Sequence, residues 1–153
     1  MNIFKKKTII YSPGNGILKP IDRINDELFS TKALGDGFAL EPNENSIFSP
    51  VEGVITSIFP TKHAISIKTT NNLDVLIHIG IDTVELNGEG FTVKVEEGAK
   101  VNKYTEIVEV DISYLELKEK ETDVIVIFTN LKEKSIEITE GNVAYKQEIG
   151  IIK

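Results

Sequence analysis

Residues 63–82 read His63-Ala-Ile-Ser-Ile-Lys-Thr-Thr-Asn-Asn-Leu-Asp-Val-Leu-Ile-His78-Ile-Gly-Ile-Asp82, and this stretch decides the fold. Two runs rich in Ile, Val and Leu flank the polar cluster 69–72. The pattern predicts two antiparallel strands joined by a tight turn. The stretch also holds both histidines of the protein, and the hairpin brings them near its open end.

The register of this hairpin decides whether the two histidines share a face. Side chains alternate across a strand, so a register whose paired residue numbers sum to 141 or 143 places His63 and His78 on one face. In the first register their Cβ atoms would be about 5 Å apart. However, Ile65 and Ile67 share the His63 face, Asp74 shares the His78 face, and the better apolar face of the second strand is the opposite one. Either the histidine face is an apolar docking surface, or a bulge breaks the simple alternation.

The composition describes one globular domain. The chain has 153 residues, of which 41% are hydrophobic and 27% charged, and this is enough to bury a core. Gly and Pro are scattered and form no linker, so we expect a short N-terminal arm or first strand over residues 1–11 and a single domain over residues 12–153. The formal net charge of -7 argues against nucleic acid as a partner and favours a basic protein.

Two absences limit the chemistry of the chain and its relation to a membrane. The chain has no cysteine, which excludes disulfides and thiolate metal sites. It shows no apolar signal-peptide core, and no segment approaches the roughly 20 apolar residues of a membrane span. We therefore expect a cytoplasmic protein without direct membrane insertion.

Short β-branched runs alternate with turn residues along the chain, which is typical of an antiparallel sandwich or barrel. The predicted strands are residues 8–11, 38–40, 46–48, 54–59, 64–68, 73–79, 91–93, 105–110, 124–128, 135–138 and 148–152. Residues 111–121 have a helical pattern and predict a short helix over one end of the sheets. The expected fold class is all-β, an antiparallel β-sandwich with short helical segments.

Two echoes in the sequence suggest a duplicated β unit. Ser12-Pro-Gly-Asn-Gly16 recurs as Ser49-Pro-Val-Glu-Gly53, and Glu97-Gly-Ala-Lys-Val101 has a looser counterpart in Glu140-Gly-Asn-Val143. Repeated turn chemistry would explain both echoes, because Pro and Gly mark where a chain enters or leaves a strand. A duplicated unit is the sharper explanation.

The two histidines are the main candidates for chemistry. A neutral imidazole nitrogen can attack phosphorus if the other ring nitrogen donates a hydrogen bond that fixes the tautomer, and a second imidazole could then hold a phosphoryl oxygen. The same pair could instead bind zinc, with Asp82 as a third ligand. His78 and Asp82 have the H-x-x-x-D spacing of some zinc peptidases. The His-x-His element of those enzymes is absent, which disfavours a zinc hydrolase.

The residues around the histidines have a structural and a functional interpretation. Gly80 is either a plain turn residue or a position where a backbone carbonyl reaches the His78 ring. Asp26 and Asp82 are either solvated carboxylates or a negative rim that steers arginines of a partner. Five apolar residues are either core or, if exposed around the histidines, a docking patch: Phe29, Phe59, Leu76, Ile79 and Val84.

Several stretches carry a resemblance to a known family. They are Leu34-Gly-Asp-Gly-Phe-Ala-Leu-Glu-Pro42, Ser49-Pro-Val-Glu-Gly53, Ile58-Phe-Pro-Thr-Lys-His-Ala64 and His78-Ile-Gly-Ile-Asp-Thr-Val-Glu-Leu-Asn-Gly-Glu-Gly-Phe91. At these residues the chain resembles the glucose-family enzyme IIA of the bacterial phosphoenolpyruvate-dependent sugar phosphotransferase system. The resemblance covers about residues 12–153.

The resemblance implies a phosphotransferase component with a phosphohistidine intermediate. His78 would accept a phosphoryl group on Nε2 from the histidine-containing phosphocarrier protein and pass it to a cysteine of the IIB domain of a glucose-type permease. His63 would contact the phosphoryl group, and Thr61 would orient the His63 ring. The Gly80 carbonyl would accept a hydrogen bond from Nδ1 of His78.

The same resemblance implies an antiparallel β-sandwich that acts as a monomer and needs no cofactor for transfer. Asp26 and Asp82 would flank the site, close enough to meet arginines of the donor. Zinc would be incidental, bound at His63 and His78 in regulatory complexes.

Two other classes of function remain open. Residues 49–55 and 95–101 resemble stretches of biotinyl- or lipoyl-type swinging-arm carriers, although the chain lacks the Met-Lys-Met or Asp-Lys hairpin that such domains modify. Alternatively, a regulatory protein could hold partners on the histidine face. Phosphorylation would then switch docking by adding negative charge to an apolar patch.

Overall fold

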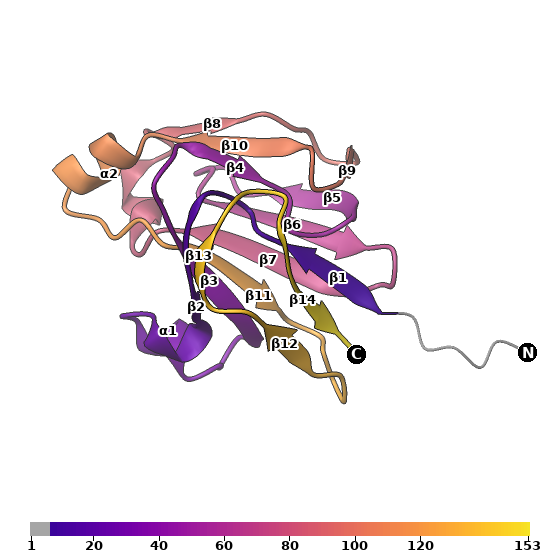
Figure 1. Ribbon diagram of the computed structural model, residues 1–153. Coiled ribbons are helices and arrows are strands. Elements are labelled where there is room, and N and C mark those ends of the chain that lie inside the picture. The colour runs from indigo at the N-terminus through magenta and orange to yellow at the C-terminus, as the bar shows by residue number, and fades with distance from the viewer. Residues whose placement is uncertain (1–6) are drawn as a thin grey trace, which may run out of the picture.

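The computed structural model describes residues 7–153, which form one long antiparallel sheet and two short ones (Figure 1). The strands are β1 (Thr8–Tyr11), β2 (Gly16–Pro20), β3 (Asp36–Pro42), β4 (Ser46–Phe48), β5 (Gly53–Ile58), β6 (Ala64–Thr69), β7 (Asp74–Ile79), β8 (Phe91–Val93), β9 (Lys100–Val101), β10 (Glu106–Val110), β11 (Val124–Phe128), β12 (Ile136–Ile138), β13 (Gly141–Val143) and β14 (Glu148–Ile152). The helices are α1 (Glu27–Ser30) and α2 (Ile112–Leu117), with 3-10 turns η1 (Ile21–Arg23) and η2 (Thr83–Leu86). Within residues 7–153, no helix has the length and apolar character needed to cross a membrane.

The order of strands confirms the predicted all-β fold. The long sheet has the order β13-β2-β3-β11-β7-β6-β5-β9, and the short sheets have the orders β1-β14-β12 and β4-β10-β8. All eleven predicted strands are present, while β2, β9 and β13 were not predicted. The predicted arm at residues 1–11 lies partly outside the described residues, and its last part is β1, which pairs with β14.

The long sheet has an internal twofold pattern that matches the two sequence echoes. Its strand order reads the same from both ends when β13 is matched with β9, β2 with β5, β3 with β6 and β11 with β7. Ser12 and Ser49 are both fully buried, and each hydroxyl donates a hydrogen bond of 2.6 Å to a carbonyl two residues further on. Gly16 pairs with Val143 as Gly53 pairs with Val101. A duplicated unit therefore describes the arrangement better than repeated turn chemistry.

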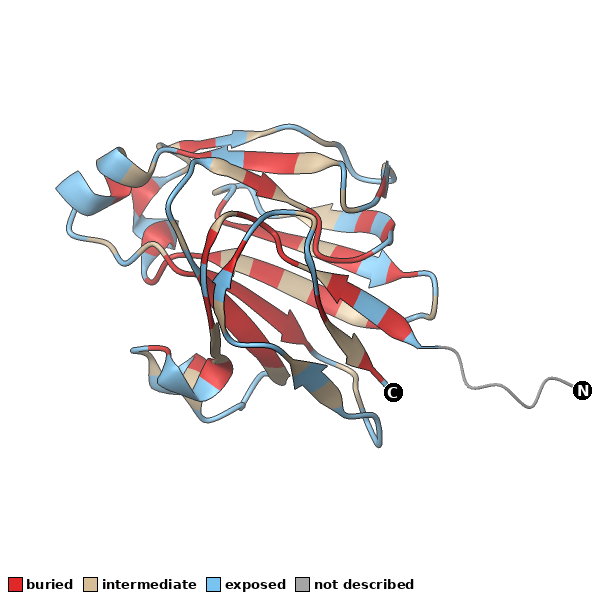
Figure 2. Ribbon diagram, in the orientation of Figure 1, coloured by how far each residue is buried: buried red, intermediate tan, exposed pale blue. Residues whose placement is uncertain are grey.

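Strand β11 lies at the centre of the long sheet and is buried on both faces (Figure 2). Val124, Val126 and Phe128 belong to the main core, which also includes residues of the two short sheets. Ile125 and Ile127 face the other side, where the segment between β2 and β3 covers them. Together they form a second apolar cluster, to which the segment contributes Ile21, Ile24 and Phe29. The histidine site lies on the same face of the sheet as this second cluster, and His78 contacts it through Phe29.

Candidate functional site

The hairpin β6–β7 forms as predicted, but in a different register. Ala64 pairs with His78 and Ile65 with Ile77, so the paired residue numbers sum to 142 and the predicted odd sums are wrong. This register places Ile65, Ile77 and Ile79 in the main core, whereas His78 faces the opposite side and is partly exposed. The apolar alternation of β7 thus decides the pairing, because a slip by one residue would expose the whole core face of the strand.

The two imidazoles meet because His63 lies just before β6, in a tight turn. The Lys62 N–H donates to the Phe59 carbonyl over 2.7 Å, and Lys62 has a φ of 62°. This turn releases His63 from the strand alternation, although its carbonyl still accepts a hydrogen bond of 2.8 Å from the Ile79 N–H. The ring centroids of His63 and His78 lie 4.9 Å apart at 84°. Broken alternation was therefore the correct alternative, although a turn breaks it and not a bulge.

Each imidazole has its Nδ1 atom fixed by a neighbour, as the resemblance implies. Nδ1 of His78 lies 2.9 Å from the Gly80 carbonyl oxygen. Because a carbonyl can only accept, Nδ1 of His78 carries a proton, and Nε2 of the neutral ring has a free lone pair. Nδ1 of His63 lies 2.7 Å from the Thr61 hydroxyl, which can donate or accept.

Only glycine fits at position 80. Gly80 has a φ of 75°, which L residues rarely adopt. A Cβ atom there would lie 2.5 Å from Cγ2 of Thr83 and 2.6 Å from the Glu121 carbonyl oxygen. The close approach of residues 80 and 121 fixes the position of the carbonyl that holds the His78 ring.

Burial keeps the pair uncharged. It lowers the pKa of His78 to about 4, helped by the nearby His63 and opposed by the Gly80 hydrogen bond and the charges of Asp26 and Asp82. Burial also lowers the pKa of His63. His78 is therefore a neutral imidazole at pH 7, the form whose nitrogen can act as a nucleophile.

Protein stability should fall in acid because of His78. The pKa of His78 is 6.5 in the unfolded chain, the ordinary value for histidine, and about 4 in the folded protein. The unfolded state therefore binds more protons between these pH values, and the free energy of unfolding rises with pH there. We expect a loss of roughly 3 kcal/mol as the pH falls from 6.5 to below 4. Urea unfolding at a series of pH values measures it. His78→Gln should flatten this part of the curve, and equal slopes for both proteins would contradict the assignment.

The predicted rim and docking patch are found only in part. Asp82 is exposed, and Asp26 caps α1, its carboxylate accepting from the Leu28 N–H over 2.8 Å. Phe59 and Val84 are 41% and 49% exposed, and Leu76 is half-buried.

Phe29 and Ile79 do not belong to an exposed patch, and that part of the prediction is wrong. Ile79 is fully buried because it faces the main core. Phe29 is buried because α1 packs it onto the second cluster, where its ring centroid lies 5.0 Å from that of His78. Phe29, as a buried member of the second cluster, therefore packs against the His78 ring.

The histidine pair offers too few ligands for a metal site of its own. Across residues 7–153 there is no group of three or more His, Cys, Asp or Glu side chains that could hold a metal ion, so Asp82 does not complete a set with His63 and His78. Zinc takes four ligands in structural sites and three protein ligands in most catalytic sites. A zinc ion at the pair would need further ligands from another molecule.

The fold and the site together define an all-β protein with two neighbouring neutral imidazoles, one of them partly exposed with a free Nε2. Comparison with known proteins gives the family. The sequence profile of the phosphoenolpyruvate-dependent sugar phosphotransferase system, EIIA 1, matches residues 8–134, and the chain belongs to this family. The glucose permease IIA from Mycoplasma capricolum has a similar structure, with a TM-score of 0.91, 35% identity and 99% coverage of both chains.

Curated relatives agree with this assignment. The chain is 41% identical over 131 residues to the PTS system glucose-specific EIIA component of Halalkalibacterium halodurans. The aligned residues are 86% of this chain and 76% of the relative. The corresponding component of Staphylococcus aureus is 39% identical over 149 residues, 97% of this chain and 90% of the relative. The PTS system glucose-specific EIICBA component of Streptococcus pneumoniae is 42% identical over 147 residues, 94% of this chain but only 20% of the relative.

Proposed function

We propose that the protein is a phosphocarrier that accepts a phosphoryl group on Nε2 of His78 from the histidine-containing phosphocarrier protein. It then passes the group to a cysteine of the IIB domain of a glucose-type permease. The observation that carries this proposal is the hydrogen bond from Nδ1 of His78 to the Gly80 carbonyl, because it leaves Nε2 free. The names of the relatives support glucose, and the EIICBA relative supports a IIB partner.

The chemistry needs only the residues of the site. The lone pair of Nε2 forms a new N–P bond with the phosphoryl group while the N–P bond of the donor phosphohistidine breaks, and its electron pair returns to the donor nitrogen. The proton on Nδ1 of His78 stays in its hydrogen bond to Gly80. In the onward step a cysteine thiolate attacks phosphorus, and the electron pair of the breaking N–P bond returns to Nε2. No metal or cofactor takes part.

His63 stabilises the transferred group in this proposal. If the Thr61 hydroxyl donates to Nδ1 of His63, then Nε2 of His63 carries the proton and can donate to a phosphoryl oxygen. Phosphoryl transfer has a loose transition state with charge spread over the oxygens, so a fixed donor there lowers the barrier. One chain holds His63, His78 and the groups that fix their rings, so the proposed transfer needs no second copy of the chain. We place this monomer in the cytoplasm.

The surface around His78 fits a basic partner. Asp26 and Asp82 are near enough to act on the charge of His78, and Phe59 and Val84 are exposed apolar side chains. A donor with arginines near its own phosphohistidine would meet both features. The added phosphate would bring negative charge beside Leu76, so it would change the electrostatics of this surface and could alter which partners dock there.

The proposal is tested by incubating the protein with phosphoenolpyruvate, enzyme I and the phosphocarrier, and then mapping the phosphate. We expect one acid-labile phosphate on Nε2 of His78, seen by ³¹P NMR and by peptide mass. A phosphate on another residue would refute the assignment. An intact mass raised by a biotinyl or lipoyl group would favour the swinging-arm alternative instead.

His63→Gln should separate the two histidine roles. Glutamine removes the imidazole but leaves His78 and its Gly80 bond in place, so the variant should still accept phosphate at a reduced rate. Transfer to the IIB domain should fall about 100-fold, as when one oxyanion donor is removed. Single-turnover transfer from phosphorylated protein to IIB measures it. Unimpaired onward transfer would show that His63 does not hold the phosphoryl group.

A further inference from the structure

The loop that holds the His78 ring depends on the segment just before β11. The Gly80 N–H donates to the Asp123 carbonyl over 2.7 Å, and the Ile81 N–H donates to the Glu121 carbonyl over 3.3 Å. Lys120 forms an ion pair with Glu85 of η2. Residues 120–123 therefore support the backbone on both sides of the Gly80 Cα atom, and a displaced Asp123 would disturb the position of Gly80.

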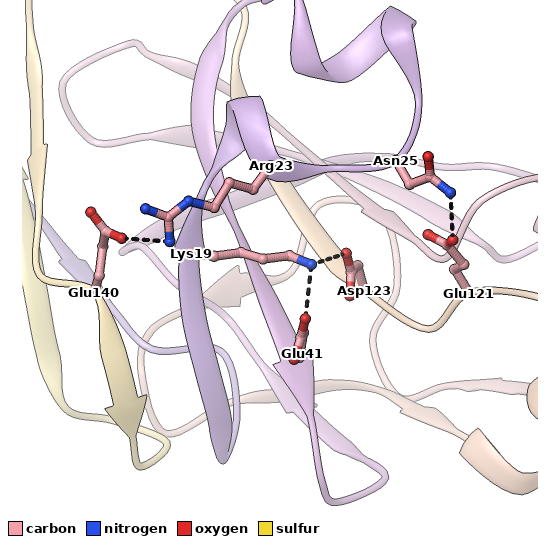
Figure 3. A network of polar contacts seen from close by, with 7 residues as sticks. All are labelled: Lys19, Arg23, Asn25, Glu41, Glu121, Asp123 and Glu140. Atoms are coloured by element: carbon pink, nitrogen blue, oxygen red, sulfur yellow. Dashed lines mark hydrogen bonds and ion pairs between the residues drawn. The ribbon is translucent and has the colours of Figure 1, made fainter.

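Asp123 is itself held by a mostly buried ion pair with β2. Its carboxylate lies 2.9 Å from Nζ of Lys19, which also lies 3.0 Å from Glu41, and Figure 3 shows the lysine head between the two carboxylates. Asp123 is only 7% exposed. Burial raises the pKa of Asp123, and the hydrogen bond and charge of Lys19 oppose that rise. Removing one partner of such a pair leaves an uncompensated buried charge, so Lys19 keeps Asp123 ionised and in place.

The twofold pattern of the sheet supplies an internal comparison. Asp74 in β7 occupies the position that matches Asp123, and its carbonyl accepts from the Thr129 N–H over 3.0 Å, as that of Asp123 accepts from Gly80. The lysine paired with Asp74 is Lys68, at 3.6 Å, and both side chains are about half exposed, 48% and 49%. The backbone contact thus occurs in both halves, but the ion pair is mostly buried in the half that supports His78 and half exposed in the other half.

We infer that Lys19 is a positioning residue for His78, acting through Asp123 and Gly80. The chain of contacts runs from Nζ of Lys19 to the Asp123 carboxylate, from the Asp123 carbonyl to the Gly80 N–H, and from the Gly80 carbonyl to Nδ1 of His78. By fixing that last carbonyl, Lys19 keeps the His78 proton on Nδ1 and leaves Nε2 free. Its effect on transfer rests on the proposed function, whereas its effect on the tautomer does not.

The test compares Lys19→Met with the matched variant Lys68→Met, in wild-type background, by ¹⁵N NMR of the His78 ring at neutral pH. The wild-type protein and Lys68→Met should show one tautomer, with the proton on Nδ1. In Lys19→Met the ring should show a mixture of tautomers, and Lys19→Arg should restore the single form. The rate constant for phosphate uptake should fall about tenfold in Lys19→Met, since small misplacements of a reacting group are costly.

The outcomes separate this inference from the proposed function. If the wild-type protein takes up no phosphate, the phosphocarrier proposal is refuted. A tautomer mixture in Lys19→Met would still support the positioning role in that case. An unchanged tautomer and rate in Lys19→Met would overturn the positioning role, and so would an equal change in Lys68→Met. Asp123→Asn removes the same charge pair with little change in shape. It should shift the tautomer in the same direction, and it serves as the test if Lys19→Met does not fold.

Discussion

Replacing His78 with glutamine should abolish phosphate uptake from the phosphocarrier. The variant has no imidazole Nε2 at the position that Gly80 prepares, and His63 is buried and has its Nδ1 engaged with Thr61. Transfer depends on a positioned nucleophile, so we expect a loss of at least about 10⁴-fold, to the background of the assay. The measurement is a single-turnover reaction with labelled phosphocarrier, followed by acid-labile phosphate counting.

The fold should survive this change, which makes the loss specific. His78 is partly exposed on the outer face of the long sheet, and glutamine at this position creates no cavity in the main core. The thermal unfolding midpoint at pH 7 should therefore stay close to that of the unchanged protein. Full phosphorylation of a folded His78→Gln variant would show that the acceptor is another residue.

Replacing Gly80 with alanine should have the largest effect on stability. The new Cβ would lie 2.6 Å from a backbone oxygen, and the backbone there has a φ of 75°. Overpacking and left-handed backbone strain each cost about 1–3 kcal/mol, so we expect a destabilisation of roughly 2–6 kcal/mol in urea unfolding. Relief of the clash would move the Gly80 carbonyl away from His78, so phosphate uptake should fall as well.

Gly98→Ala is the matched control for this experiment. Gly98 has a φ of 89°, similar to that of Gly80, but an added Cβ there meets nothing within 4 Å. Its replacement should cost about 1 kcal/mol, the backbone part alone, and leave phosphate uptake unchanged. If Gly98→Ala and Gly80→Ala were equally destabilising, crowding against residues 83 and 121 would have no role.

Sequence patterns predicted the fold wherever local signals were strong. The five apolar residues Val124–Phe128 gave β11, and the structure explains the lack of alternation, because both faces are buried. Strand β9 has only two residues and exists through its pairing with β5, which no local pattern encodes. The helix predicted over residues 111–121 ends at Leu117, because Leu115 is its one buried residue and Leu117 is 76% exposed.

The site was predictable where a motif specified it and less so where packing decides. The neighbours of the histidines, Thr61 and Gly80, lie where the resemblance implies. The register was wrong because His63 was assigned to a regular strand, and the turn at Lys62 has no strong signal in the sequence. Lys19 and Asp123 were missed because they are over 100 residues apart in sequence and contact only in the folded protein. An aspartate directly before a fully apolar strand was the available hint.

The twofold pattern of the long sheet has a consequence for stoichiometry. The twofold pattern relates the pair Ala64 and His78 to the pair Gly37 and Ile127, so Ile127 is the position equivalent to His78 in the other half. Ile127 is buried in the same apolar cluster as Ile21 and Phe29, so the second half of the sheet has no counterpart of the histidine site. Under the proposed function each chain would carry a single phosphoryl group at a time, and flux through such a relay would scale with the number of molecules and not with the number of repeats.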